Sequence, residues 1–575
     1  MIILLKNILL IYFVLSLYLI SKKLALVFFK DNKIENNLIL YIFVFISVTY
    51  LIFLSIILGL YNNYIIYLLS LLCLITPIIY FTEIKNFKFR EILKDKLFLL
   101  FLPYFIISLF PASDADSLDY HLGAAKFWIE NEKNLPLHNW IHFRLASYGE
   151  ILNIFSIKFF DGKFLSFLKV FLLFLLTKII FNNFKEKKNI NVFLYCLLSS
   201  PILIYFISNQ KPQFIGYLIL IVSFLFIILK KKENFTSIFL AYVSSLKFSF
   251  LPLVSILFFF AIISNNINKK KFTISFIFFL ILFWTPLLIK NYIFYLNPLS
   301  PFFENYLSNS PDETVINFSN MLKNYSEYGL SNFYAFLNIL LPLSFSSITT
   351  YFGVGILLYI LTKNFSKQAK MIFILSIIMF LSYFLIGQFS SRYLYLSYFL
   401  LIFSCLFFEI RFRVFFYNLL KLQMLIVYLF LISISFLNFT SLINTTKYEN
   451  YLESRAYQYK EANWIKKNII NENYTSDIRS KYFLNKNHFS IEFIFYTPKN
   501  IVDDKLLNFI KKNNIKKVTL LVDDGFIYNK FKFCKKNILT KDFKVLRRNF
   551  LAKEKIIKRQ IFDLDLDNEK CEIKL

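Results

Sequence analysis

A short polar stretch, residues 112–150, interrupts a chain that is otherwise strongly apolar. It opens with three closely spaced carboxylates, Asp114, Asp116 and Asp119, directly after the apolar run 97–111. Charged side chains at a membrane surface are costly to bury and usually serve a function. A carboxylate within hydrogen-bonding reach of a hydroxyl can remove its proton. This stretch is therefore where we expect acid–base chemistry.

The three carboxylates need not share one role. If the segment after Ser113 is helical, Asp116 and Tyr120 lie four residues apart and share one face, with His121 adjacent. Asp114 or Asp116 could instead cap the N-terminus of that helix, which would account for one carboxylate but not the others. We predict that Asp116 is the main catalytic candidate with Asp114 beside it, and that Tyr120 and His121 are candidate substrate contacts.

Three of the four histidines, His121, His138 and His142, lie in the same stretch. Together with the carboxylates they supply enough ligands for a divalent metal. His138 and His142 have helical spacing only if Pro136 permits a helix there, and interfacial hydrogen bonding is the other interpretation. We predict that no cofactor is required, and we keep the three histidines as weaker metal candidates. Glu150 either contacts substrate or caps the apolar segment that follows it.

The composition indicates a membrane protein. The 575 residues are 57% hydrophobic with a mean hydropathy of +0.56, and apolar runs recur between residues 8 and 440. A soluble core would not need so many, so we predict a mainly α polytopic membrane bundle of about 12–14 spans. The net charge of +29 comes largely from lysine clusters between apolar runs. The positive-inside rule explains these clusters without a nucleic-acid partner.

The lysine clusters also predict a topology. One alternating assignment places them all in the cytoplasm, and it places residues 112–150, the loop around Asn297 and everything after residue 440 on the other side. This assignment requires that residues 235–263 cross the membrane twice, with Lys247 near the turn. The sequence thus predicts an inner (plasma) membrane protein whose active site and C-terminal region face the outside.

The composition changes after residue 440, where charged residues become frequent. We predict a transmembrane domain over residues 1–440 and a small external α/β domain over residues 441–575. Alternating or periodic apolar positions predict its elements, namely helices at 457–470 and 506–512 and strands at 517–522 and 561–566. Cys534 and Cys571 would face an oxidising compartment and either form a disulfide or remain two thiols.

The carboxylate motif is similar to that of a known family. Asp116-Ser-Leu-Asp-Tyr120-His121-Leu122 resembles the first external loop of GT-C fold glycosyltransferases related to the protein O-mannosyltransferase and aminoarabinose transferase superfamily. Asp116 matches the family's Asp four residues before an aromatic, and Asp114 makes the D-x-D variant of some branches. Gly123 stands where one subset has Pro.

Further motifs follow in the family's order. They are Ser245-Leu-Lys247-Phe248-Ser249, Trp284-Thr-Pro286, Lys290-Asn291-Tyr292, Asn297-Pro298-Leu-Ser-Pro301-Phe302 and Ser391-Arg392-Tyr393. Each motif is short, but together they span nearly the whole chain. Leu296 stands where the family usually has Gly.

The resemblance implies a GT-C fold and an inverting transfer of a sugar from a polyprenyl-phosphate donor to a hydroxyl of a lipid, glycan or protein acceptor. Lys247 and Arg392 would then stabilise the phosphate leaving group, Asp116 would act as base, and Lys290 and Asn291 are candidate substrate contacts. Ordinary snorkelling to the interface is the alternative for both cations.

Two other classes of function fit the same residues. The first is a transporter or flippase of lipid-linked saccharides, in which ionisable groups would cluster near the bilayer midplane. The second is a non-catalytic assembly factor. The predicted gathering of ionisable groups at one membrane face favours the enzyme.

Overall fold

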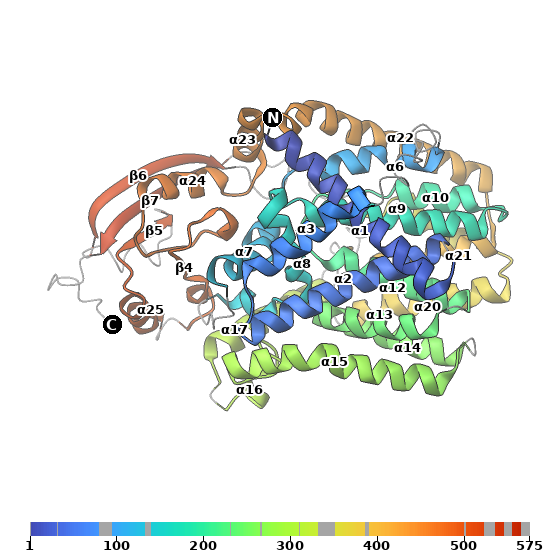
Figure 1. Cartoon of the computed structure of the whole chain (residues 1–575), viewed down its shortest axis with the longest axis horizontal. Coiled ribbons are helices and arrows are strands. Elements are labelled where there is room, and N and C mark those ends of the chain that lie inside the picture. Colours follow the sequence, from blue (N-terminus) through green and yellow to red (C-terminus); the bar gives the residue numbers. More distant parts are fainter. Residues whose placement is uncertain are drawn as a thin grey trace. The chain divides into compact units, whose positions relative to one another are not determined.

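The structure is a computed structural model, and it is mainly helical with a small sheet (Figure 1). It describes residues 2–31, 33–79, 95–132, 140–230, 232–264, 267–309, 311–331, 351–385, 390–498, 502–521, 535–545 and 555–564.

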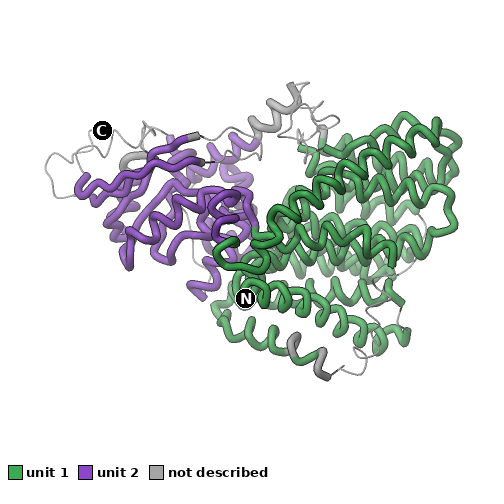
Figure 2. The backbone as a smooth tube through the Cα atoms, turned by 90° about the horizontal axis from the view of Figure 1, so that it is seen from above, with its two compact units in different colours: residues 1–111, 147–286, 324–448 green, residues 112–146, 287–323, 449–575 purple. Residues whose placement is uncertain are grey.

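The chain divides into two compact units, coloured separately in Figure 2. Unit 1 consists of Met1–Pro111, Ser147–Pro286 and Asn324–Tyr448. Unit 2 consists of Ala112–Ala146, Leu287–Lys323 and Glu449–Leu575. The polar stretch that opens with the three carboxylates is therefore packed with C-terminal residues, far away in sequence.

Unit 1 is built from apolar helices. They are α1 (Ile2–Phe29), α2 (Ile34–Ile57), α3 (Asn63–Ile79), α6 (Lys96–Ser108), α8 (Tyr148–Phe160), α9 (Phe164–Phe184), α10 (Ile190–Leu198), α11 (Ile202–Ile207), α12 (Gln213–Ile228), α13 (Glu233–Leu246), α14 (Leu251–Ile263), α15 (Lys269–Tyr295), α19 (Leu358–Leu361), α20 (Lys367–Leu385), α21 (Tyr395–Ser404), α22 (Arg413–Asn438) and α23 (Thr445–Arg455). The last residues of α15 and of α23 belong to unit 2.

Five of the described helices are long and apolar enough to cross a membrane. They are α1, α2, α9, α15 and the helix that begins with α22, and the mean hydropathy of their most apolar windows lies between 2.1 and 2.5. Four shorter apolar helices accompany them: Lys96–Ser108, Gln213–Ile228, Phe248–Ile263 and Tyr395–Phe407. The prediction of a mainly α, membrane-embedded protein is confirmed at this level. The GT-C type, the sidedness and the number of spans stay predictions.

Two helix breaks in unit 1 shape its polar features. The apolar run 191–207 is split into α10 and α11 at Pro201, because proline cannot donate the backbone hydrogen bond that a continuous helix needs. The predicted run 235–263 is also interrupted, and Lys247 lies at the interruption in an extended conformation (φ −167°, ψ 135°). A short 3₁₀ turn, Phe248–Phe250, then leads into α14. Both breaks leave polar residues between apolar helices.

Unit 2 contains a five-stranded mixed sheet with the order β4-β3-β5-β7-β6. Strand β3 (Tyr474–Ser476) pairs in parallel with β4 (His488–Ser490) and β5 (Lys517–Leu521). Strand β7 (Lys555–Leu564) pairs antiparallel with β5 and with β6 (Lys535–Val545). A separate two-residue ladder in unit 1 joins β1 (Thr362–Lys363) and β2 (Glu409–Ile410).

Two helices pack against this sheet. Successive residues of a strand point to opposite faces. In β7, Ile561 belongs to the apolar cluster of α24 (Tyr459–Asn468), and Phe562 belongs to that of α25 (Val502–Lys512), so the two helices cover opposite faces (Figure 1). The sequence predicted both helices, β5 and the end of β7, and it missed β3, β4 and β6.

The remaining helices of unit 2 come from the two segments inserted between parts of unit 1. They are α7 (Leu122–Asn131), α16 (Glu304–Leu307) and α17 (Glu313–Ser331), of which α17 extends beyond the unit's boundary. Ile141 and Phe318 lie in the same apolar cluster as α25. The inserted segments are therefore part of the hydrophobic core of unit 2.

Candidate active site

The acidic turn begins with a capping contact at Asp114. The backbone N–H of Ser117 donates to Oδ1 of Asp114 at 3.0 Å, which is the role that an aspartate plays at a helix start. Residues Ser117–His121 then form a π-helical turn that continues into α7. Such turns widen the helix locally and often occur at functional sites. The segment after Ser113 is therefore helical, with a π-helical turn in place of the regular spacing considered for Asp116 and Tyr120.

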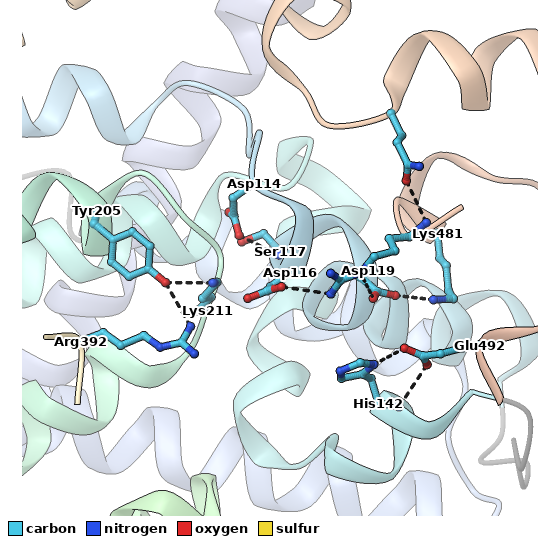
Figure 3. A network of polar contacts seen from close by, with 12 residues as sticks. Asp114, Asp116, Ser117, Asp119, His142, Tyr205, Lys211, Arg392, Lys481 and Glu492 are labelled. Atoms are coloured by element: carbon cyan, nitrogen blue, oxygen red, sulfur yellow. Dashed lines mark hydrogen bonds and ion pairs between the residues drawn. The ribbon is translucent and has the colours of Figure 1, made fainter. Parts of the chain in front are cut away.

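Asp116 and Asp119 meet at one arginine. The Nη2 of Arg479 lies 3.2 Å from Oδ1 of Asp116, and its Nε lies 3.3 Å from Oδ2 of Asp119. The ammonium of Lys481 lies 2.5 Å from Oδ1 of Asp119 (Figure 3). We call these four residues the carboxylate cluster. The Asp119 side chain is fully buried, whereas the Asp116 side chain is 29% exposed. A buried carboxylate needs such cationic partners.

An aromatic ring packs against the carboxylate cluster. The Lys481 ammonium lies 4.8 Å from the centre of the Trp140 ring, a favourable cation–π distance. A Cβ atom on Gly123 would lie 3.0 Å from Cη2 of Trp140. Gly123 therefore allows the ring to approach α7 closely, at the position where one subset of the resembling family has Pro.

His142 and Glu492 form a second, adjacent ion pair. The Nδ1 of His142 contacts Oε1 of Glu492, and the His142 backbone N–H lies 3.3 Å from Oε2 (Figure 3). Burial alone would lower the pKa of His142, but the charges of Glu492 and Asp119 raise it above its ordinary value. Burial alone would raise the pKa of Glu492, but His142 and Lys481 lower it. Tyr120 stacks on His142 with ring centres 5.3 Å apart.

Asp119, His142 and Glu492 could supply three metal ligands. One ligand atom from each lies within 4.8 Å of the other two, and a carboxylate–histidine set suits a divalent transition metal. Asp119 already contacts Lys481, however, and Glu492 already contacts His142, so a metal would compete with these cations. The candidate His121 is buried, and His138 lies outside the described residues. Metal dependence stays a prediction.

The other candidates in unit 2 contact the backbone. The ammonium of Lys290 donates to the carbonyl oxygen of Ala146 at 2.8 Å, and the Asn291 amide donates to Ser300 and Pro298 carbonyls at 3.3 and 3.2 Å. These contacts hold the loop after α15 and the end of the polar stretch. Cys534 and Cys571, the candidate disulfide pair, lie outside the described residues.

In unit 1, the contacts of Ser147 connect Glu150 to the helix break at Lys247. The Ser147 backbone N–H donates to Oε2 of Glu150 at 2.8 Å, which caps α8. The Ser147 hydroxyl donates to the carbonyl oxygen of Leu246 at 2.6 Å. Since Leu246 precedes Lys247, this bond ties the start of α8 to the helix break that carries the lysine.

Lys211 and Arg392 converge on one phenolic oxygen. The ammonium of Lys211 lies 2.9 Å from the hydroxyl oxygen of Tyr205, and Nη1 of Arg392 lies 3.4 Å from it (Figure 3). The Arg392 guanidinium lies 5.0 Å from the centre of the Tyr393 ring. The positive charges of Arg392, Lys247 and Lys211 all act on the Tyr393 hydroxyl. We call Lys211, Lys247 and Arg392 the basic cluster.

Lys211 is held by the turn between α11 and α12. The Lys211 backbone N–H donates to Oδ1 of Asn209 at 2.9 Å. The same oxygen accepts from the fully buried Lys169 of α9 at 3.0 Å. Lys169 also donates to the carbonyl oxygens of Phe206 and Asn209. A buried ammonium thus fixes the turn that presents Lys211.

Sequence reasoning missed three residues of these clusters. Lys211 carried one signal: it lies between two apolar runs on the side assigned to the outside, where the positive-inside rule makes lysine less frequent. Arg479 and Lys481 carried none, because they lie in a region where charged residues are common.

Comparison with known proteins identifies the family of this chain. A family model described as the DUF1420 N-terminal domain matches residues 3–435, three-quarters of the chain. The chain belongs to the DUF1420 family. No curated protein and no solved structure matches it.

The DUF1420 match divides the site residues into two groups. Asp116, Asp119 and the whole basic cluster lie within the matched segment. Arg479, Lys481 and Glu492 lie after it. In this DUF1420 protein, the cations that contact the two carboxylates therefore come from beyond the segment that the family model matches.

Proposed function

We propose that this protein is an integral-membrane glycosyltransferase that moves a sugar from a polyprenyl-phosphate donor to an acceptor hydroxyl. The proposal is supported by the motif resemblance and by apolar helices that suit a lipid-linked donor. The observation that carries it is the convergence of Lys211 and Arg392 on one oxygen, the Tyr205 hydroxyl, within a unit of apolar helices. Two cationic donors directed at one oxygen atom are the arrangement that an anionic phosphate oxygen needs.

The basic cluster would act on the leaving group. When the bond between the sugar C1 and the phosphate oxygen breaks, its electron pair remains on that oxygen as negative charge. Fixed cations placed where this charge develops lower the barrier, because they need no reorganisation during the reaction. Lys211, Lys247 and Arg392 would bind the phosphate before the reaction and stabilise its additional charge afterwards.

Asp116 would act on the acceptor. Its carboxylate would take the proton of the acceptor hydroxyl while the acceptor oxygen forms a bond to C1. The donor bond breaks on the opposite side of C1, so the anomeric configuration inverts and no covalent enzyme intermediate is needed. Asp114 is less suited to this role because its carboxylate caps the π-helical turn. The two clusters belong to different units, and their roles are proposed separately.

The substrates and location follow from the same proposal. The acceptor would be a lipid, a growing glycan or a protein, and the reaction would take place on the non-cytoplasmic face, where the positive-inside rule places both the acidic turn and the turn that carries Lys211. A transporter or flippase of lipid-linked saccharides is the alternative, with the same cations holding phosphate during translocation.

A reconstituted assay separates the two functions. The full chain would be placed in nanodiscs and given a panel of polyprenyl-phosphate monosaccharides with candidate acceptors, and free polyprenyl phosphate would be followed by mass spectrometry. We expect its release to depend on the acceptor. In sealed proteoliposomes, movement of the intact donor across the bilayer without its cleavage would support the transporter and contradict the transferase.

A further inference from the structure

Arg479 lies on a short segment of unit 2 that is firmly held. Its backbone N–H donates to Oε1 of Gln458 at 2.9 Å, and the hydroxyl of the next residue, Ser480, donates to the carbonyl oxygen of Tyr457. Two residues before Arg479, the Asp477 carboxylate contacts the fully buried Arg559 of β7. The position of the guanidinium is therefore set by the sheet and by α24, not by the acidic turn alone.

The acidic turn brings two negative charges close together, and the positive charge of Arg479 offsets their repulsion. Asp116 and Asp119 are three residues apart and both direct an oxygen at the same guanidinium. Two carboxylates that share a site repel each other. A guanidinium is planar and carries five N–H donors, so it can bridge two carboxylates in a fixed geometry.

The two carboxylates differ in a way that assigns their roles. Asp119 is fully buried and contacts both Arg479 and Lys481, whereas the side chain of Asp116 is partly exposed. Asp119 can thus keep Arg479 in place while Asp116 gains or loses a proton. In this arrangement Asp119 would hold Arg479 in place, and Asp116 would act as the base beside the same cation.

We propose that Arg479 is a positioning residue for Asp116, supplied by the C-terminal segment, which holds the Asp116 carboxylate in place and keeps it ionised beside Asp119. The inference rests on the proposed function in that Asp116 is the base. It also gives the C-terminal part of unit 2 a role in the reaction, since that part delivers Arg479 and Lys481 to the acidic turn.

The pH profile of sugar transfer tests this role. In Arg479→Gln we expect the acidic limb of the kcat profile to move up by about 1 to 2 pH units, because the stabilising positive charge is gone. In Arg479→Lys, which keeps the charge but makes fewer contacts, the limb should stay near that of the wild type while kcat falls. The proposal would be overturned if kcat fell in both variants while the acidic limb of each stayed at its wild-type position. A purely structural role predicts that result.

A second measurement does not depend on transfer. Carbodiimide labelling of Asp116 in the full chain, followed by peptide mass spectrometry across pH, reports its ionisation directly. We expect the labelling midpoint to rise in Arg479→Gln and to stay unchanged in Lys505→Gln, a control that breaks an ion pair of the same unit with Asp312 (2.9 Å).

The transfer assay and the labelling experiment together distinguish a failure of the proposed function from a failure of the role assigned to Arg479. If the wild type transfers no sugar but the labelling midpoint still rises in Arg479→Gln, the proposed function fails and Arg479 still controls the charge of Asp116. If the wild type transfers sugar and neither the midpoint nor the acidic limb moves, the role of Arg479 is wrong. If Arg479→Gln does not fold, Arg479→Lys decides: a lowered kcat at the wild-type Tm supports the positioning role, whereas a wild-type kcat, or a lowered kcat together with a lowered Tm, rejects it.

Discussion

Lys211 and Arg392 share one hydrogen-bond acceptor, the hydroxyl oxygen of Tyr205, although they are far apart in the sequence. Lys211 reaches it from the turn between α11 and α12, and Arg392 from the segment before α21. Two positive charges near one point repel each other, and a bound anion offsets this repulsion while it interacts with both. The pair is therefore expected to bind an anion more strongly than either residue alone. The predictions below begin with this pair.

Replacement of Lys211 should weaken donor binding. A hydrogen bond to a charged group contributes about 1.5 to 3 kcal/mol, so Lys211→Ala should reduce the affinity for polyprenyl phosphate by about ten- to a hundredfold. Binding would be measured by native mass spectrometry in nanodiscs. Lys178→Ala is the matched control, because Lys178 pairs with Asp95 at 2.8 Å elsewhere in unit 1. Equal affinities for Lys211→Ala and the control would remove Lys211 from the phosphate site.

Asp116 and Asp114 should respond differently to the same substitution. Asp116→Asn removes the base and should abolish sugar transfer while the protein still inserts into the membrane. Asp114→Asn keeps an oxygen that can accept from the Ser117 N–H, so transfer should persist. Asp114→Ala should lower the stability of the turn by about 1 kcal/mol. Transfer would be assayed beside thermal unfolding, and activity retained in Asp116→Asn would reject this base assignment.

The His142–Glu492 pair should stabilise the fold within a defined pH window. The pKa of His142 is raised, so its contribution is complete below its ordinary value of 6.5 and is lost as pH rises through the folded value. The pKa of Glu492 is lowered, so its contribution is complete above its ordinary value of 4.5 and is lost as pH falls toward the folded value. The full contribution should therefore appear between these two ordinary values.

Thermal unfolding of wild type and Glu492→Gln across pH 4 to 9 measures this contribution. We expect the difference in Tm to be largest inside the window and to shrink on both sides. In a His142→Gln background, the decline of that Tm difference at alkaline pH should disappear, because the histidine that loses its proton there is gone. A Tm difference that stays constant from acid to alkaline pH would contradict the ion pair.

Arg559 should be essential for the stability of unit 2. Its Nε lies 2.6 Å from the Glu461 carboxylate and its Nη1 contacts Asp477, and all three side chains are almost fully buried. Arg559→Met leaves two buried carboxylates without this cation, which should cost about 3 to 5 kcal/mol. Limited proteolysis of the full chain would show earlier cleavage in unit 2. Arg413→Met, at a half-buried arginine of α22 that donates to the Lys188 carbonyl oxygen, is the control.

The triple variant Arg559→Met, Glu461→Gln and Asp477→Asn tests the cause. It removes the unpaired charges, so it should recover much of the lost stability. If Arg559→Met is as resistant to protease as the wild type, the buried charges are compensated in another way.

The sequence by itself predicted a mainly helical protein with long apolar helices, because membrane helices are determined by local composition. A run of apolar residues forms a helix in a bilayer whatever surrounds it, since its backbone polar groups must bond to one another. The helices α24 and α25 were predicted from their amphipathic periodicity, and the break at Lys247 was predicted from the basic residues at both ends of the run 235–263. The strands β3 and β4 were not, because each has three residues, too few to show an alternating pattern.

The partners of the candidate residues were decided only by the tertiary structure. The sequence left open whether Asp114 or Asp116 caps the helix, and the structure makes Asp114 the cap and directs Asp116 to Arg479. Arg479 and Lys481 are separated from the acidic turn by more than three hundred residues. Such a contact depends on how distant segments pack, and spacing along the chain carries no information about it. Composition thus determined the helical, membrane-embedded class, and packing determined which charges meet.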